Sequence, residues 1–78
     1  MVILNNIKLN NMGIECDYDP EKSGKIGHII LKQDGNADIR YSDYEYGKQT
    51  YAKKVIAKLE SLMEDMDNIP NHTAVTWY

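Results

Sequence analysis

The hydrophobic residues between positions 47 and 67 recur at intervals of three and four, a pattern found in no other part of the chain. At 3.6 residues per turn, this spacing places them along one face of an α-helix. We therefore predict a helix over about residues 48–67 that begins near Lys48 or Thr50. Its apolar face consists of Ala52, Val55, Ile56, Leu59, Leu62, Met63 and Met66.

Most of the remaining hydrophobic positions alternate with polar ones, which is typical of β-strands. Four such segments precede the helix, separated by turn-forming residues, and a β-branched and aromatic segment follows it. The predicted strands cover residues 2–9, 14–19, 26–32, 37–41 and 73–78. The order ββββαβ predicts a single α+β domain over residues 1–78. Its two layers are an antiparallel sheet of four to five strands and one helix packed across one face.

The alternation also predicts which side chains face the helix. In the first strand we expect the inner face to carry Ile3, Ile7 and Leu9. In the fourth we expect Ala37, Ile39 and Tyr41 to point inward, and Asp38, Arg40 and Ser42 to point outward. The apolar run Ile29–Leu31 predicts a third strand covered on both faces, and Val75 or Trp77 should close the core.

Composition narrows the function classes. The net charge is −3 and Arg40 is the only arginine, which argues against direct nucleic-acid binding because phosphate contacts need clustered basic residues. With one cysteine, no apolar run long enough to span a bilayer and no signal peptide, the chain is predicted to be cytoplasmic without a membrane partner. Ile, Lys, Asn and Tyr make up 30 of the 78 residues, and their AT-rich codons indicate a low-GC bacterium, phage or plasmid.

Two groups of residues resemble chemical sites. Asp34, Asn36, Asp38 and Glu45 have the spacing of a calcium-binding loop, but Ile39 occupies the position that normally requires glycine. A small calcium- or ligand-binding module is therefore kept only as an alternative, and we expect no bound metal or cofactor.

Cysteine catalysis is the second chemical alternative. Cys16 could form a thiolate pair with His28 or His72. However, Cys16 shares its strand face with Ile14 and Tyr18 and is expected to be buried. We therefore predict no catalytic residue and a chain that is not an enzyme.

The segment before the helix combines tyrosines with acidic residues. Ser42 and Glu45 match a capping box, which offers a second start signal for the helix. Tyrosines are enriched at protein interfaces because they offer rigid apolar area with a polar tip. We predict a partner-binding surface formed by Asp38, Tyr41, Asp43, Tyr44, Glu45 and Tyr46.

The charges of the predicted helix are arranged against its dipole, which favours acids at the N-terminus and bases at the C-terminus. Its first half carries Lys48, Lys53, Lys54 and Lys58, and its second half Glu60, Glu64, Asp65 and Asp67. This polarity is either solvated or used toward a partner. In a two-fold homodimer, the basic half of one helix would face the acidic half of the other. A self-associating structural domain, with either the helix or an uncovered sheet edge as the seam, is therefore a further alternative.

Residues 27–62 contain, in order, an apolar strand, the Asp34-Gly35-Asn36 hairpin, a second strand, the acidic segment Ser42-Asp43-Tyr44-Glu45 and the amphipathic helix. This organisation resembles the small acidic inhibitors that phages make against CRISPR nucleases, several of which are α+β folds that mimic the charge of DNA. The resemblance implies a host protein as partner, such as a nucleic-acid-binding enzyme whose basic surface is occupied. It also implies that Asp43 and Glu45 mimic phosphates.

Overall fold

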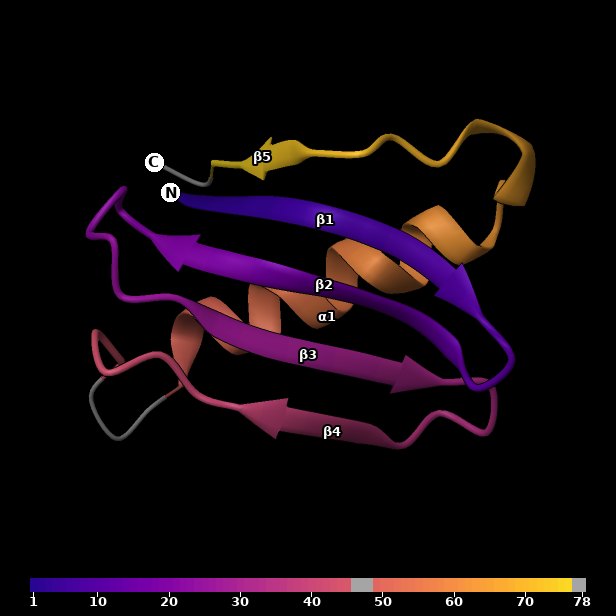
Figure 1. The fold of residues 1–78 in the computed structure, drawn as a ribbon, viewed down its shortest axis with the longest axis horizontal. Helices are drawn as coiled ribbons and strands as arrows, with labels where there is room; N and C mark the ends of the chain where they lie inside the picture. Colours follow the sequence, from indigo (N-terminus) through magenta and orange to yellow (C-terminus); the bar gives the residue numbers. More distant parts are fainter. Residues whose placement is uncertain (46–48, 77–78) are drawn as a thin grey trace.

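A computed structural model of the chain describes residues 1–45 and 49–76. It confirms the predicted α+β fold, an antiparallel five-stranded sheet in the order β4-β3-β2-β1-β5 with one helix packed against it (Figure 1). The elements are β1 (Val2–Asn10), β2 (Gly13–Pro20), β3 (Gly27–Lys32), β4 (Ala37–Arg40), α1 (Thr50–Met63), a 3-10 turn η1 (Met66–Asn68) and β5 (Thr73–Val75). No helix of the described segments is long and apolar enough to cross a membrane.

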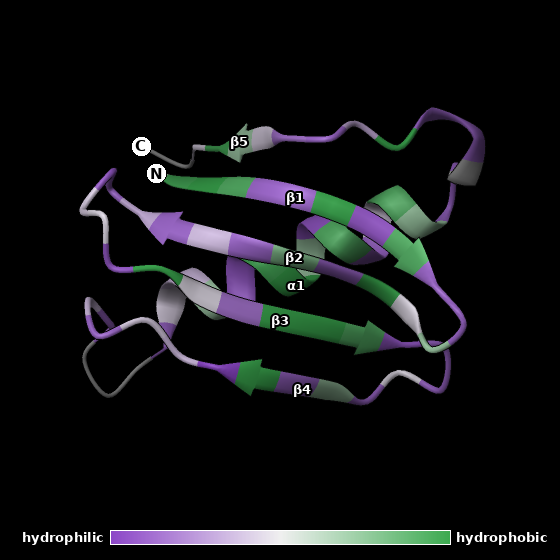
Figure 2. Cartoon of the chain, in the orientation of Figure 1, coloured by the Kyte–Doolittle hydropathy of each residue, from purple (hydrophilic) through white to green (hydrophobic). Residues whose placement is uncertain are grey.

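The core lies between the helix and the face of the sheet that is turned toward it. The helix contributes Ala52, Val55 and Leu59, all at most 1% exposed. Alternate residues of the three central strands fill the other side, as the interleaved hydrophobic and hydrophilic bands of β1 and β2 show (Figure 2). The buried strand residues are Val2, Leu4, Ile7, Ile14, Cys16, Tyr18, Ile29 and Leu31.

The opposite face of the sheet is not covered by any element among the described residues (Figure 1). Ile30 lies on this face, where its register partners are Glu15 of β2 and Asp38 of β4. The prediction that the third strand is covered on both faces is therefore wrong. Ile30 is half-buried beside these polar register partners, and α1 packs on the other side of the sheet.

A β-bulge divides the first strand. The pairing of β1 with β2 shifts between Asn5 and Lys8, where Asn6 has a φ of 55°. Because the bulge adds one residue, the inward positions change phase from Val2 and Leu4 to Ile7. The prediction that Ile3 shares the inner face with Ile7 is thus wrong. Leu9, also predicted inward, is 43% exposed near the end of the strand.

The helix begins at Thr50, one of the two predicted starts, and ends at Met63, four residues earlier than predicted. Gln49 precedes it in a left-handed conformation and provides no side-chain cap. The last strand contains only Thr73–Val75; Val75 packs against the core, and Trp77 lies outside the described residues. The start of β1 and the end of β5 lie side by side at the same end of the sheet (Figure 1).

Candidate functional site

The predicted partner-binding surface falls largely on residues 41–45, which follow β4 in the sequence. We call this segment the connector. Ser42 is only 3% exposed, although it was predicted to point outward. Its N–H donates to the Tyr18 hydroxyl at 2.9 Å, and its hydroxyl donates to the carbonyl of Lys25. The same hydroxyl accepts the N–H of Tyr44 at 3.0 Å. These bonds turn Ser42 inward.

The predicted orientation of Tyr41 is also wrong, in the opposite direction. It was predicted to point into the core, yet it is 44% exposed. The strand alternation stops at Arg40, the last residue of β4, so the period of two no longer applies at Tyr41. The Tyr41 hydroxyl donates to the Gln49 side chain at 3.3 Å. The ring therefore lies toward the start of the helix while remaining open to solvent.

Tyr18 of β2 holds the connector from inside the protein. Its ring is fully buried over Gly27, its register partner in β3. A Cβ atom on Gly27 would lie 2.3 Å from Cε1 of that ring, so only glycine leaves room for it. The Tyr18 hydroxyl accepts the N–H of Ser42 and donates to the carboxylate of Glu45. Burial, followed by the bond to Glu45, raises the pKa of Tyr18 well above its usual value.

Glu45 joins the connector to the helix. One carboxylate oxygen accepts the Tyr18 hydroxyl, and the other accepts the N–H of Ala52 at 2.7 Å. The latter satisfies one of the N–H groups that the first turn of a helix leaves without a partner. Glu45 thus caps the helix from outside it, whereas the predicted capping box with Ser42 does not form. Both oxygens of Glu45 are engaged within the chain.

The other predicted site residues occupy two places. Tyr41, Asp43 and Tyr44 lie on the connector, with Asp43 exposed and Tyr44 half-buried. The Tyr44 ring packs edge-on against Tyr51, with centroids 5.6 Å apart. Asp38 lies instead on the uncovered face of β4, where its carboxylate is 3.2 Å from the Lys32 ammonium. The predicted residue Tyr46 lies outside the described residues.

A second polar cluster, which the sequence reasoning did not identify, lies on the uncovered face. His28 of β3 stands between two acids of β2, with Nδ1 at 2.7 Å from Asp17 and Nε2 at 2.9 Å from Glu15. The Asn6 amide also donates to Asp17 at 2.9 Å, and Lys8 approaches Glu15 at 3.7 Å. Ionised carboxylates only accept hydrogen bonds, so both ring nitrogens must carry protons. His28 is therefore an imidazolium in this arrangement.

The pKa values agree with this assignment. The hydrogen bond to Asp17, assisted by that to Glu15, raises the pKa of His28 against a smaller opposing effect of burial. The bond from His28 lowers the pKa of Glu15. Partial burial acts to raise the pKa of Asp17, but the bonds from His28 and Asn6 together leave it lowered. The three groups therefore hold one another in their charged forms.

The cluster offers little for acid–base or nucleophilic chemistry. Both nitrogens of His28 are engaged, so neither is available to accept a substrate proton. Cys16 is fully buried on the opposite face of the sheet, and burial, followed by neighbouring acids, raises the pKa of its thiol to about 12. The Cys16–His28 pair weighed from the sequence is thus not formed. An open hollow of about 340 Å³ lies beside His28, lined also by Asn6, Lys8, Asp17 and Asn71.

The first residues of the calcium-loop pattern, Asp34 and Asn36, form a tight turn. Asp34 accepts the N–H of Asn36 at 3.0 Å and its side-chain amide at 3.1 Å, which closes the hairpin between β3 and β4. Across residues 1–45 and 49–76, no three acidic, histidine or cysteine side chains converge as a metal site.

The sequence held part of the signal for the His28 cluster, because Glu15 and Asp17 alternate outward along one segment. What it lacked was the register that places His28 opposite Asp17. Comparison of the chain with protein-family models, with curated proteins and with solved structures finds no match. The function is therefore inferred from these contacts alone.

Proposed function

We propose that the protein is a small interaction module that binds a partner protein through the connector surface, formed by Tyr41, Asp43 and Tyr44. The observation that supports this is the way an irregular, exposed segment is fixed from beneath. Ser42 and Glu45 together take part in six hydrogen bonds, one of them between their own backbones and five to other buried or backbone groups. A surface that is already ordered loses little conformational entropy on binding.

The chemistry of the connector surface indicates a basic partner site. Tyr41 supplies exposed aromatic area, which suits an anchor in an interface. Asp43 adds an exposed carboxylate that can meet lysine or arginine. Glu45, which the sequence suggested as a second phosphate mimic, is not part of the proposal. Both of its carboxylate oxygens accept hydrogen bonds within the chain.

In the narrower form of the proposal, the chain is encoded by a phage or mobile element and acts in the cytoplasm of its host. It would occupy the basic surface of a nucleic-acid-binding host protein and so inhibit it. The net charge of −3 and the exposed Asp43 support this form.

The test is capture from a host lysate followed by binding to the purified captured protein. We expect Asp43→Lys combined with Tyr44→Ala to weaken binding by about tenfold or more. Glu60→Lys is the matched control, since it makes the same charge change on an exposed helix residue away from the connector. Melting temperatures must stay close to that of the wild type. Equal binding by the connector variant and the control would refute the proposal.

A further inference from the structure

Strand β4 forms an edge of the sheet, and no described element pairs with its outer side. β4 is the first strand in the sheet order and pairs only with β3 among the described elements. At the hairpin, the N–H of Lys32 donates to the carbonyl of Asn36 at 2.8 Å. In antiparallel pairs the hydrogen-bonded positions alternate, so Asp38 and Arg40 bond to β3. Ala37 and Ile39 therefore direct their N–H and C=O groups away from the sheet.

The charges on this edge are complementary to a second copy of themselves. Proteins often place like charges on an open edge, because two copies then repel each other. Here the two charges are opposite and lie symmetrically about Ile39, with Asp38 before it and Arg40 after it. When two such strands meet antiparallel, each acid faces the base of the other strand.

We propose that two copies of the chain associate through β4, antiparallel, with Ile39 facing Ile39 on a two-fold axis. The outward N–H and C=O groups of Ile39 then bond to those of the second copy. Asp38 and Arg40 form the flanking pairs, which lack backbone bonds and bring the side chains closest together. The two sheets join into one, and an isologous interface results.

The helix side of the same edge fits this register. Tyr41 lies just after β4, where its hydroxyl bonds to Gln49 at the start of the helix, and in this register its backbone falls next to Ala37 of the second copy. Tyr41 is 44% exposed in the single chain, and Ala37 and Ile39 are only partly covered by the core. Association would bury all three, which adds apolar contact to the backbone bonds.

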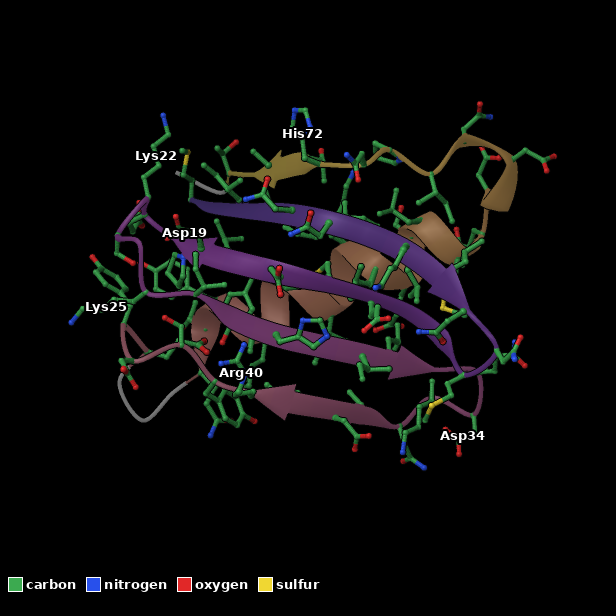
Figure 3. The ribbon with its side chains drawn as sticks, viewed as in Figure 1. Asp19, Lys22, Lys25, Asp34, Arg40 and His72 are labelled. Carbon is green, nitrogen blue, oxygen red and sulfur yellow. The ribbon has the colours of Figure 1, made fainter. Side chains whose placement is uncertain are left out.

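The existing partner of Asp38 does not oppose this arrangement. Asp38 pairs with Lys32 at 3.2 Å, but its side chain is 63% exposed. An ion pair in this position contributes little and exchanges readily for another. The opposite edge, β5, has only three residues and no charged side chain, so it has no comparable pairing. Arg40 and the Asp34 turn lie at opposite ends of β4 (Figure 3).

The inference goes beyond the proposed function and shares only Tyr41 with the connector surface. The seam takes residues 37–41, whereas Asp43 and Tyr44 stay outside it. Its test needs only the purified chain, so its outcome is separate from that of partner binding.

The experiment is sedimentation equilibrium of the full chain from about 10 µM to about 1 mM, together with charge-reversal variants. We expect a monomer–dimer equilibrium that weakens as salt is raised. Asp38→Arg alone and Arg40→Asp alone each place like charges face to face, so each should weaken dimerisation by about tenfold or more. The double exchange Asp38→Arg/Arg40→Asp should restore it. An equimolar mixture of the two single variants should give heterodimers.

A wild-type chain that stays monomeric at about 1 mM would overturn the inference. So would a dimer that is unchanged in both single variants, or one that neither the double exchange nor the mixture restores. Amide hydrogen exchange gives a second readout, because this register bonds the Ile39 N–H to the second copy and so protects it on dimerisation. Asp43→Lys/Tyr44→Ala is the control and should dimerise like the wild type.

Discussion

The two faces of β2 stabilise the protein by different physical means. On one face, Cys16 and Tyr18 are fully buried under the helix, where apolar burial dominates. On the other face, Glu15 and Asp17 are held by His28 in a charged network that remains partly open to water. The first kind of stabilisation hardly depends on pH, whereas the second depends on three protonation states. The alternation of side chains along β2 thus places both kinds of stabilisation on one strand.

The largest expected effect comes from the buried face. Leu59→Ala removes the side chain at the centre of the core and should cost about 2–5 kcal/mol. That is comparable with the whole stability of about 3–5 kcal/mol expected of a domain this small. Urea denaturation followed by circular dichroism should show a largely unfolded variant. A midpoint near that of the wild type would mean that the helix contributes little to the core.

Ile30→Ala is the matched substitution on the uncovered face. Ile30 is half-buried among polar side chains rather than under the helix, so its truncation leaves no enclosed cavity. We expect a cost of about 1 kcal/mol or less, measured in the same titration. Equal losses at Leu59 and Ile30 would contradict the distinction between the faces.

Tyr18→Phe should have an intermediate effect, because it breaks polar contacts within the buried face. The N–H of Ser42 and the carboxylate of Glu45 would both lose the hydroxyl, at a cost of about 1–3 kcal/mol. The variant should also loosen the connector, seen as faster amide exchange at Tyr44. Tyr51→Phe is the control, since its hydroxyl bonds to the partly exposed Glu21. A larger loss in the control would refute the role given to Tyr18.

His28→Gln should have a smaller effect at neutral pH, on the order of 1 kcal/mol, because its ion pairs are partly screened by solvent. The pH dependence is the sharper test. The folded-state pKa of His28 is raised above its ordinary 6.5, so the pairs stabilise fully below about pH 6.5. This stabilisation is lost as pH rises through the folded-state pKa. Melting temperatures between about pH 6 and pH 9 should therefore fall more steeply in the wild type than in the variant.

At acidic pH the sign is reversed. The pKa values of Glu15 and Asp17 are lowered in the folded protein, so their contribution is present above the unfolded values and lost as pH falls through the folded ones. His28→Gln removes the main partner of both acids and should flatten this limb as well. A variant with the wild-type profile at both ends would show that His28 is not the bridging group.

The fold could be predicted because its signals are local. The stripe at Val55 and Leu59 and the alternation from Ile14 to Tyr18 each specify an element without knowledge of its neighbours. The bulge at Asn6 could not be predicted in this way, because asparagine tolerates positive φ but does not require it. It reversed the assignment of Ile3.

The candidate site was harder to predict because it depends on pairing over long distances. Ser42 points inward because its N–H donates to the hydroxyl of Tyr18, which lies 24 residues earlier. The same hydroxyl donates to the carboxylate of Glu45. His28 meets Asp17 only because β2 and β3 pair in one register. The sequence identified the connector as rich in tyrosine and acidic residues. It could not distinguish the residues that hold the connector against the core, Ser42 and Glu45, from those on its surface.

Gly27 has a consequence that reaches beyond the space it leaves for Tyr18. If β3 slid by two residues along β2, Lys25 or Ile29 would replace it beneath the aromatic ring, and the strands could not close. The absence of a side chain at Gly27 therefore excludes both two-residue shifts of β3 along β2. By fixing this alignment, Gly27 also determines that His28, the next residue of β3, lies opposite Asp17 on the other face of the sheet.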